Sequence, residues 1–260
     1  MAPFRCYHKS SSREFPSQYF EGKGVSVHKR TLIMTVTVSV VILVAAISGI
    51  LLALNKTGFI GTSETKELQT VEVREYRGEQ LSSVNDFREN SIKGPQYVDM
   101  ESYQLKITGL VDNPKNYTYD VIIDEHQLYE KVVRLDCVGG WSVNILWEGM
   151  LVRDLIVEAK ALPEAKVVIF HAYDGYTTSF PIDYIMNNDI IMAYKMNEVI
   201  MPPERGFPFQ LVAESKWGYK WIKWITEIEL SDDEYYRGYW ESRGYSNEAD
   251  LDKSFFDFSP

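Results

Sequence analysis

Residues 31–54 form a run of 24 residues without a charged side chain. A helix of about 20 apolar residues, rising about 1.5 Å per residue, spans the hydrocarbon core of a bilayer. The segment therefore predicts a transmembrane helix. A buried helix of a soluble domain normally carries a polar stripe, and a cleaved signal peptide has a shorter apolar region nearer the N-terminus, so both alternatives fit the segment less well.

The charges on either side of this segment predict its orientation. Residues 1–30 contain six Lys and Arg against two Glu, and Lys29 and Arg30 lie at its edge, which predicts a cytoplasmic N-terminus. Residues 55–260 carry 21 basic and 35 acidic residues, a net charge of −14. We therefore expect a single-pass membrane protein with its folded part extracytoplasmic. Its expected parts are a basic cytoplasmic segment (1–30), a transmembrane helix (31–54), a stalk (55–79) and a folded domain (80–260).

Composition excludes several classes of protein. The formal net charge is −10, so the chain lacks the basic footprint of a nucleic-acid-binding protein, and we expect no nucleic-acid partner. Cys6 and Cys137 are its two cysteines, and they lie on opposite sides of the predicted membrane helix, so they cannot pair. Two cysteines and four scattered histidines also lack the paired spacing of a structural zinc module.

The sequence of the expected extracytoplasmic part predicts short strands and few helices. Residues 103–109 alternate like a half-buried strand, and residues 110–114 close it with turn chemistry. Further strands are predicted at residues 132–136, 166–171, 177–180, 210–212 and 221–230, and helices at 151–160 and 182–187. The pattern predicts a strand-rich α+β domain.

Cys137 lies where a predicted strand runs into a Gly139-Gly140 turn. A lone cysteine there is a candidate nucleophile or a ligand for a soft metal, although free cysteine commonly behaves as a small buried hydrophobe. A thiol enzyme would need a histidine as base. Neither His126 nor His171 lies in a recognisable partner motif.

Lys216, Lys220 and Lys223 lie within eight residues, among aromatic side chains. Three cations in an acidic domain reverse the local charge and favour an anionic ligand. A strand with aromatic residues on one face and solvated lysines on the other explains the same spacing. Aromatic and basic interleaving is also typical of single-stranded nucleic-acid sites, which the acidic surroundings oppose.

Six motifs, in order along the chain, resemble the molybdopterin domain of the sulfite oxidase family. The likeness extends from about residue 81 to residue 245 and is greater to the branch that contains the periplasmic methionine sulfoxide reductase catalytic subunit. The motifs are residues 103–114, 135–142, 147–155, 174–177, 202–206 and 216–224.

The resemblance implies a sulfite-oxidase-type fold and a molybdenum-molybdopterin cofactor. Cys137 matches the family's one protein ligand to molybdenum, and we expect it to be the catalytic residue. Gln210 stands where the reductase branch has a cofactor-binding arginine. The cofactor-binding residues implied by the resemblance are Asn90, Ser91, Ile92, Cys137, Arg205, Gln210, Lys216, Lys220, Trp221, Ile222 and Lys223.

The implied activity is two-electron transfer of an oxygen atom to or from a small substrate. The sulfite-oxidising members have an arginine-rich run after the cysteine, whereas here residues 138–141 read Val-Gly-Gly-Trp, which favours reduction of an S-oxide or N-oxide. The chain has no C-x-x-C-H haem motif, so we expect a separate electron partner, a membrane haem protein or a quinone-linked carrier. Sulfite oxidation, a non-catalytic pterin- or anion-binding module and a thiol enzyme are the alternatives.

The predicted orientation can be tested by protease protection. A protease added to intact cells or right-side-out vesicles should digest residues 55–260, because the basic flank keeps residues 1–30 inside. Immunodetection of tags at the two ends measures this. Protection of residues 55–260 until the membrane is lysed would reverse the orientation.

Overall fold

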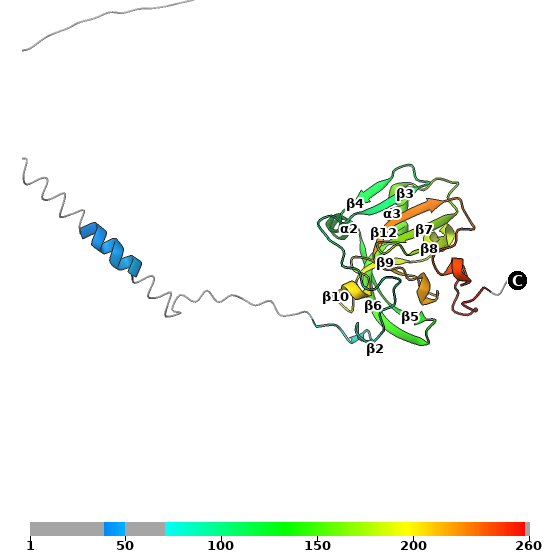
Figure 1. The fold of residues 1–260 in the computed structure, drawn as a ribbon, viewed down its shortest axis with the longest axis horizontal. Coiled ribbons are helices and arrows are strands. Elements are labelled where there is room, and N and C mark those ends of the chain that lie inside the picture. The colour runs from blue at the N-terminus through cyan, green and yellow to red at the C-terminus, as the bar shows by residue number, and fades with distance from the viewer. Residues whose placement is uncertain (1–38, 50–70, 258–260) are drawn as a thin grey trace, which may run out of the picture. The chain divides into compact units, whose positions relative to one another are not determined.

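The computed structural model describes residues 39–49 and 71–257 (Figure 1). The chain divides into two units, residues 1–67 and residues 68–260. In the first unit, residues 39–49 form a helix inside the predicted transmembrane segment. Among the residues described, no helix is both long enough and apolar enough to cross a bilayer. The rest of the predicted segment lies outside the described residues, as do residues 1–30 and 55–70.

Two five-stranded sheets form the second unit. The first has the order β4-β3-β12-β7-β8, with β12 parallel to β3 and antiparallel to β7. The second has the order β10-β9-β6-β5, with β11 also paired to β9. Their bounds are β3 Leu105–Gly109, β4 Lys115–Tyr117, β7 Val167–Ala172, β8 Thr177–Pro181, β12 Ile225–Ser231, β5 Leu128–Cys137, β6 Trp141–Leu151, β9 Ile191–Met196, β10 Val199–Ile200 and β11 Gln210–Val212.

Short helices connect and cover the sheets. The α-helices are α2 Tyr119–Glu125, α3 Val152–Ala159 and α4 Ile182–Asn187, and the 3₁₀ turns are η1 Pro203–Arg205, η2 Gly218–Lys220 and η3 Glu241–Arg243. Helix α3 contacts α4 and β3, and it ends where Lys160 adopts a left-handed conformation. The prediction of a strand-rich α+β domain is confirmed.

Most predicted elements are present, with corrected bounds. The strand expected at 221–230 begins only at Ile225, because residues 218–220 form η2 and Trp224 has a φ of 53°. The strand expected at 132–136 is twice as long and pairs with β6, which the sequence analysis missed. A two-strand pair, β1 Glu75–Tyr76 and β2 Glu79–Gln80, lies at the end of the predicted stalk. Glu72, before it, accepts a hydrogen bond from the amide of Val84 (2.8 Å).

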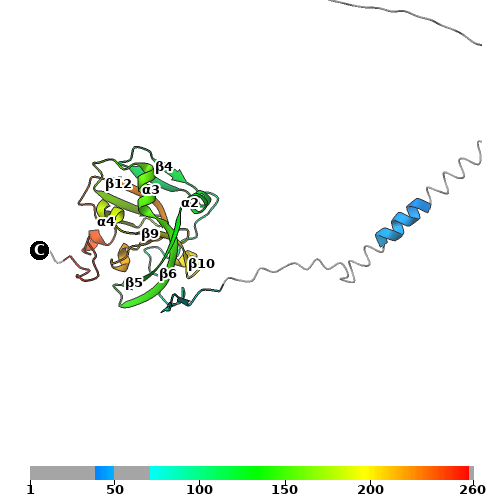
Figure 2. The ribbon, with the colours of Figure 1, turned by 180° about the vertical axis from the view of Figure 1, so that it is seen from behind.

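The β5–β6 hairpin lies at the end of the second unit opposite β3 and β4 (Figures 1 and 2). In β5 only Val133 and Leu135 are buried, on either side of the exposed Arg134, whereas most of β6 is buried. Trp147 of β6 is fully buried, packs on Trp221 (ring centroids 5.6 Å apart) and donates to the carbonyl of Val133 (3.0 Å). These contacts join the hairpin to the segment after η2.

Gly149→Ala should destabilise the domain through backbone overlap. A Cβ at Gly149 would lie 2.1 Å from the carbonyl oxygen of Met192 and 2.7 Å from Cα of Ala193 on the paired strand β9. We expect a loss of unfolding free energy at the upper end of overpacking costs, about 3 kcal/mol or more, measured by urea denaturation.

Gly78→Ala is the control, because Gly78 has a positive φ and open space around it. It should cost only conformational strain, about 1–2 kcal/mol. Equal losses in the two variants would show that the close approach of β6 and β9 does not require glycine.

Candidate functional site

A cavity of about 540 Å³ lies at the end of the β5–β6 hairpin. Its volume is within the usual range of about 300–1,000 Å³ for small-molecule and cofactor sites. Its wall is built from segments far apart in the sequence: residues 87–94, the end of β5 and the turn after it, the β7–β8 turn, residues 204–210, residues 218–224 and residues 240–245. The site therefore requires the complete fold.

Cys137 is the last residue of β5 and lines this cavity, half-buried. The backbone N–H of Gly139 donates to its sulfur at 3.4 Å, and Nδ2 of Asn90 lies 3.6 Å away. Both donors stabilise negative charge on the sulfur. Gly140, with a φ of 80°, turns the chain back into β6 while its N–H bonds the carbonyl of Cys137 (3.0 Å). The arrangement presents a sulfur ligand to whatever fills the cavity.

Asn90, Ser91 and Ile92 line the cavity next to Cys137. The Oγ of Ser91 is buried and has no hydrogen-bond partner among the residues described. A buried hydroxyl without a partner costs about 1–3 kcal/mol, so a polar ligand in the cavity would relieve that cost. This unsatisfied group, together with the thiol, fits a polar, metal-bearing cofactor.

Arg205 and Gln210 lie on a second wall. The Nε of Arg205 donates to the carbonyl of Val84 (2.8 Å), and its guanidinium lies 4.1 Å from the ring centroid of Phe87. Gln210, on β11, is 4% exposed and also lines the cavity. The stacked guanidinium is held in place and keeps its remaining N–H groups available for an anion.

Lys223, Trp221 and Ile222 also line the cavity. The Nζ of Lys223 lies 2.6 Å from a carboxylate oxygen of Glu89 and 4.3 Å from the ring of Trp224. Burial lowers the pKa of Lys223, and the Glu89 carboxylate opposes that shift. Lys223 is thus a cation of the cavity wall with an internal counterion.

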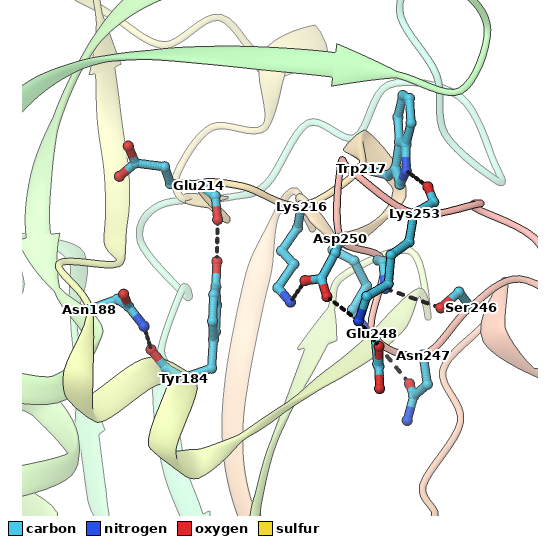
Figure 3. Close-up of polar contacts among 12 residues, drawn as sticks. Tyr184, Asn188, Glu214, Lys216, Trp217, Ser246, Asn247, Glu248, Asp250 and Lys253 are labelled. Carbon is cyan, nitrogen blue, oxygen red and sulfur yellow. Dashed lines mark hydrogen bonds and ion pairs between the residues drawn. The ribbon is translucent and has the colours of Figure 1, made fainter.

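Lys216 and Lys220 are not among the residues that line the cavity. Lys216 forms an ion pair with Asp250, which also binds Lys253 at 3.0 Å (Figure 3). Lys220 is fully buried and pairs with Glu241 at 2.7 Å. The charge reversal that predicted an anionic ligand is therefore neutralised within the chain. The structure brings nine of the eleven predicted site residues to the cavity and places these two elsewhere.

The Lys220–Glu241 pair joins η2 to η3. Thr178 donates to the same Glu241 oxygen (2.6 Å), and the ring of Phe180 lies 4.9 Å from the Lys220 ammonium. Burial lowers the pKa of Lys220, while Glu241 raises it. Because Trp240 precedes Glu241 and lines the cavity, the pair fixes the wall formed by the C-terminal segment.

The sequence analysis did not assign several aromatic and acidic residues of the wall. Phe87 packs on Trp141 with ring centroids 5.6 Å apart. Aromatic enrichment in residues 235–245 is a signal that could have located part of this wall. The unassigned residues include Phe87, Glu89, Asp174, Tyr176, Tyr219, Trp240 and Tyr245.

Residues 92–240 match the family described as "Oxidoreductase molybdopterin binding domain". The chain belongs to this family. The match covers more than half of the chain. It contains most of the residues that line the cavity, including Cys137, whereas residues 87–91 and Tyr245 of the lining lie outside it.

Two curated relatives and one solved structure are similar to the chain. The uncharacterized oxidoreductase YuiH of Bacillus subtilis (strain 168) is 33% identical over 157 residues, covering 60% of this chain and 78% of YuiH. The putative protein-methionine-sulfoxide reductase subunit YedZ1 of Azospira oryzae is 31% identical over 149 residues, covering 57% of this chain and 56% of YedZ1. The sulfane dehydrogenase SoxCD of Paracoccus pantotrophus matches with a TM-score of 0.55 and 19% identity, covering 73% of this chain and 57% of that one, which shows a shared fold.

The resemblance to the sulfite oxidase family is thus confirmed, and the protein is a molybdenum cofactor-dependent oxidoreductase. Its cofactor is molybdenum-molybdopterin. Cys137, which lines the cavity, would hold the metal. The unsatisfied Ser91 hydroxyl and the cations Arg205 and Lys223 would hold the organic part of the cofactor. These assignments of single residues remain predictions.

The buried ion pair can be separated from cofactor binding by mutation. Lys220→Met should lower the unfolding free energy by about 3–5 kcal/mol, because it leaves Glu241 buried without its partner. Lys220→Met combined with Glu241→Leu should recover most of this loss. Urea denaturation measures the unfolding free energy of each variant, and pterin content measures whether it still binds the cofactor.

Lys253→Met is the control, because its ion pairs are solvent-exposed and should contribute less than about 1 kcal/mol. The double variant should retain pterin. Full stability with lost pterin would instead assign Lys220 to the cofactor.

Proposed function

We propose that the protein removes the oxygen atom from an S-oxide or N-oxide group of a small substrate without net charge and thereby reduces the sulfur or nitrogen. The observation that carries this proposal is the charge balance around Cys137. Arg88, Arg205 and Lys223 are the lining cations, and Glu89, Asp174 and Glu204 are the lining carboxylates. A doubly charged anion such as sulfite would instead favour several free arginines beside the sulfur.

Lys223 and Arg205 are the cations that we expect to hold the organic part of the cofactor, so neither is left for an anionic substrate. Lys223 is paired with Glu89, and Arg205 is held by Val84 and Phe87. Arg134, three residues before Cys137, forms an ion pair with Asp136 (2.7 Å) and does not line the cavity. An aromatic residue, Trp141, lies beside the thiol instead. This wall suits a weakly polar sulfoxide better than sulfite.

The cofactor supplies two-electron exchange of an oxygen atom when it is bound. The chain contributes the metal-binding thiolate of Cys137, held by Asn90 and the amide of Gly139. The aromatic side chains of Trp141, Trp221 and Trp240 line the cavity. In the overall reaction a sulfoxide, two protons and two electrons give a sulfide and water.

The electrons come from a separate protein in this proposal. YedZ1 is named as a subunit of a putative protein-methionine-sulfoxide reductase, which supports both an S-oxide substrate and an assembly with another chain. This chain spans about half of YedZ1, so the S-oxide substrate and the assembly with another chain are proposals for this protein. A membrane haem protein or a quinone-linked carrier fits an electron donor at a membrane.

We further propose that residues 31–54 anchor the protein and that its catalytic domain is extracytoplasmic. The support is the 24-residue uncharged segment and the basic residues before it. An anchored domain stays within reach of a membrane-bound electron donor.

Turnover of defined substrates tests the proposed reaction. Purified holoenzyme with a reduced artificial donor should reduce sulfoxides or N-oxides faster than it oxidises sulfite with an artificial acceptor. Cys137→Ser should lose most bound molybdenum, because a neutral hydroxyl is a poorer ligand than a thiolate for this metal. Metal analysis and donor oxidation are the measurements.

Ser142→Ala is a control in the same hairpin, where an exposed side chain is changed outside the cavity lining. It should keep both metal and activity. Sulfite-dependent reduction of an acceptor without turnover of any oxide would reject the proposed substrate class. Equal molybdenum in Cys137→Ser and the unmodified enzyme would remove Cys137 from the metal.

A further inference from the structure

Gly139 leaves a small space between the sulfur of Cys137 and the indole of Trp141. A Cβ built on Gly139 would lie 3.5 Å from the sulfur, 3.7 Å from Nε1 of Trp141 and 3.8 Å from its Cδ1. These are ordinary van der Waals distances, so a methyl group would fit. The thiol and the indole N–H therefore border the same volume.

The turn itself does not require glycine at this position. Gly140 is the residue with a positive φ, of 80°, whereas Gly139 is absent from the positive-φ residues. A side chain at 139 would be compatible with the backbone and with its neighbours. What glycine provides here is the space beside the sulfur, within the cavity lining.

The indole of Trp141 is held in position. Trp141 is the first residue of β6 and is paired with Cys137 across the hairpin. Its ring packs on Phe87, whose own ring carries the guanidinium of Arg205. The indole N–H is thus fixed next to the sulfur by strand pairing and by ring packing.

This N–H has no acceptor among the residues that the structure describes. By contrast, the indole N–H groups of four other tryptophans donate to backbone carbonyls: Trp147, Trp217, Trp221 and Trp224, at 3.0, 3.2, 3.0 and 2.7 Å. Trp240 also lines the cavity and also has an indole N–H without an acceptor in the described part of the chain. It is not among the atoms nearest to a Cβ built on Gly139, which belong to Cys137 and Trp141. Trp141 is the one that combines both features within residues 71–257.

We propose that the Trp141 indole N–H donates a hydrogen bond to the oxygen of the substrate's S–O or N–O group, in the space that Gly139 leaves open. Indole N–H is a donor only, and such an oxygen is a strong acceptor. The reduced product lacks this oxygen and loses the bond. Trp141 and Gly139 thereby favour the oxide over its product. This inference rests on the proposed function.

Binding without turnover tests it. Oxidised holoenzyme, with no electron donor, is titrated calorimetrically with methyl phenyl sulfoxide and with methyl phenyl sulfide. Trp141→Phe keeps the aromatic wall and removes the donor, so sulfoxide affinity should fall about 3- to 10-fold, as for one lost hydrogen bond. Sulfide affinity should stay unchanged.

Two further variants sharpen the result. Gly139→Ala puts a methyl group into the space and should weaken sulfoxide binding more than sulfide binding, which also tests the inference if Trp141→Phe fails to load the cofactor. Trp240→Phe is the matched control, because it removes a free indole N–H from the cavity wall away from Gly139. It should leave the ratio of the two affinities unchanged.

The two proposals fail differently. An unchanged affinity ratio in Trp141→Phe and Gly139→Ala, in enzyme that reduces sulfoxides, would overturn the Trp141 inference and leave the proposed function standing. Unmodified holoenzyme that oxidises sulfite and neither binds nor reduces S-oxides and N-oxides would overturn the proposed function, and the inference with it.

Discussion

The pairing of β5 with β6 is the interaction on which the site depends. Ten residue pairs in register, from Leu128 with Met150 to Cys137 with Trp141, fix where the hairpin closes. A shift by one residue would exchange the two faces of each strand, taking Val133 and Leu135 out of the core. The same shift would move the sulfur away from the cavity. The buried side chains of the hairpin therefore set the position of Cys137, the predicted metal ligand.

A second constraint is the fully buried Lys220–Glu241 pair. Burying an ion pair carries a desolvation cost that its attraction does not reliably exceed, so it is weak support for stability. Its geometric consequence is clearer, because it ties η3 to η2, and both adjoin residues of the cavity wall. The C-terminal segment thus has one position against the cavity. Lys220 was predicted to bind the cofactor. In the structure it does not line the cavity and instead pairs with Glu241.

Local patterns predicted several elements because their burial alternates or their turns are clear. Helix α4 and strand β11 have the predicted bounds. Strands β6 and β9 were missed because they are buried on both faces, which removes the period of two. The sequence pattern could not show that residues 221–224 lie outside the strand, because a local apolar pattern does not reveal the positive φ of 53° at Trp224. Nine of the residues that the family resemblance implied line the cavity. Carboxylate partners such as Asp250 are distant in sequence and gave no local signal.

The net negative charge of the domain explains why three lysines that are close in sequence do not form one anion site. Residues 55–260 have a net charge of −14, so a lysine in this part finds a carboxylate within reach more readily than in a basic domain. Lys216, Lys220 and Lys223 each do so, with Asp250, Glu241 and Glu89. Only the last pair lines the cavity, where a bound anion would compete with Glu89 for the ammonium. A cluster of cations in an acidic chain is therefore as consistent with internal pairing as with a ligand. Burial alone does not separate the two cases, because the side chains of Lys216 and Lys223 are 12% and 14% exposed. Their positions differ, since only the Lys223–Glu89 pair lines the cavity, where we expect the cofactor.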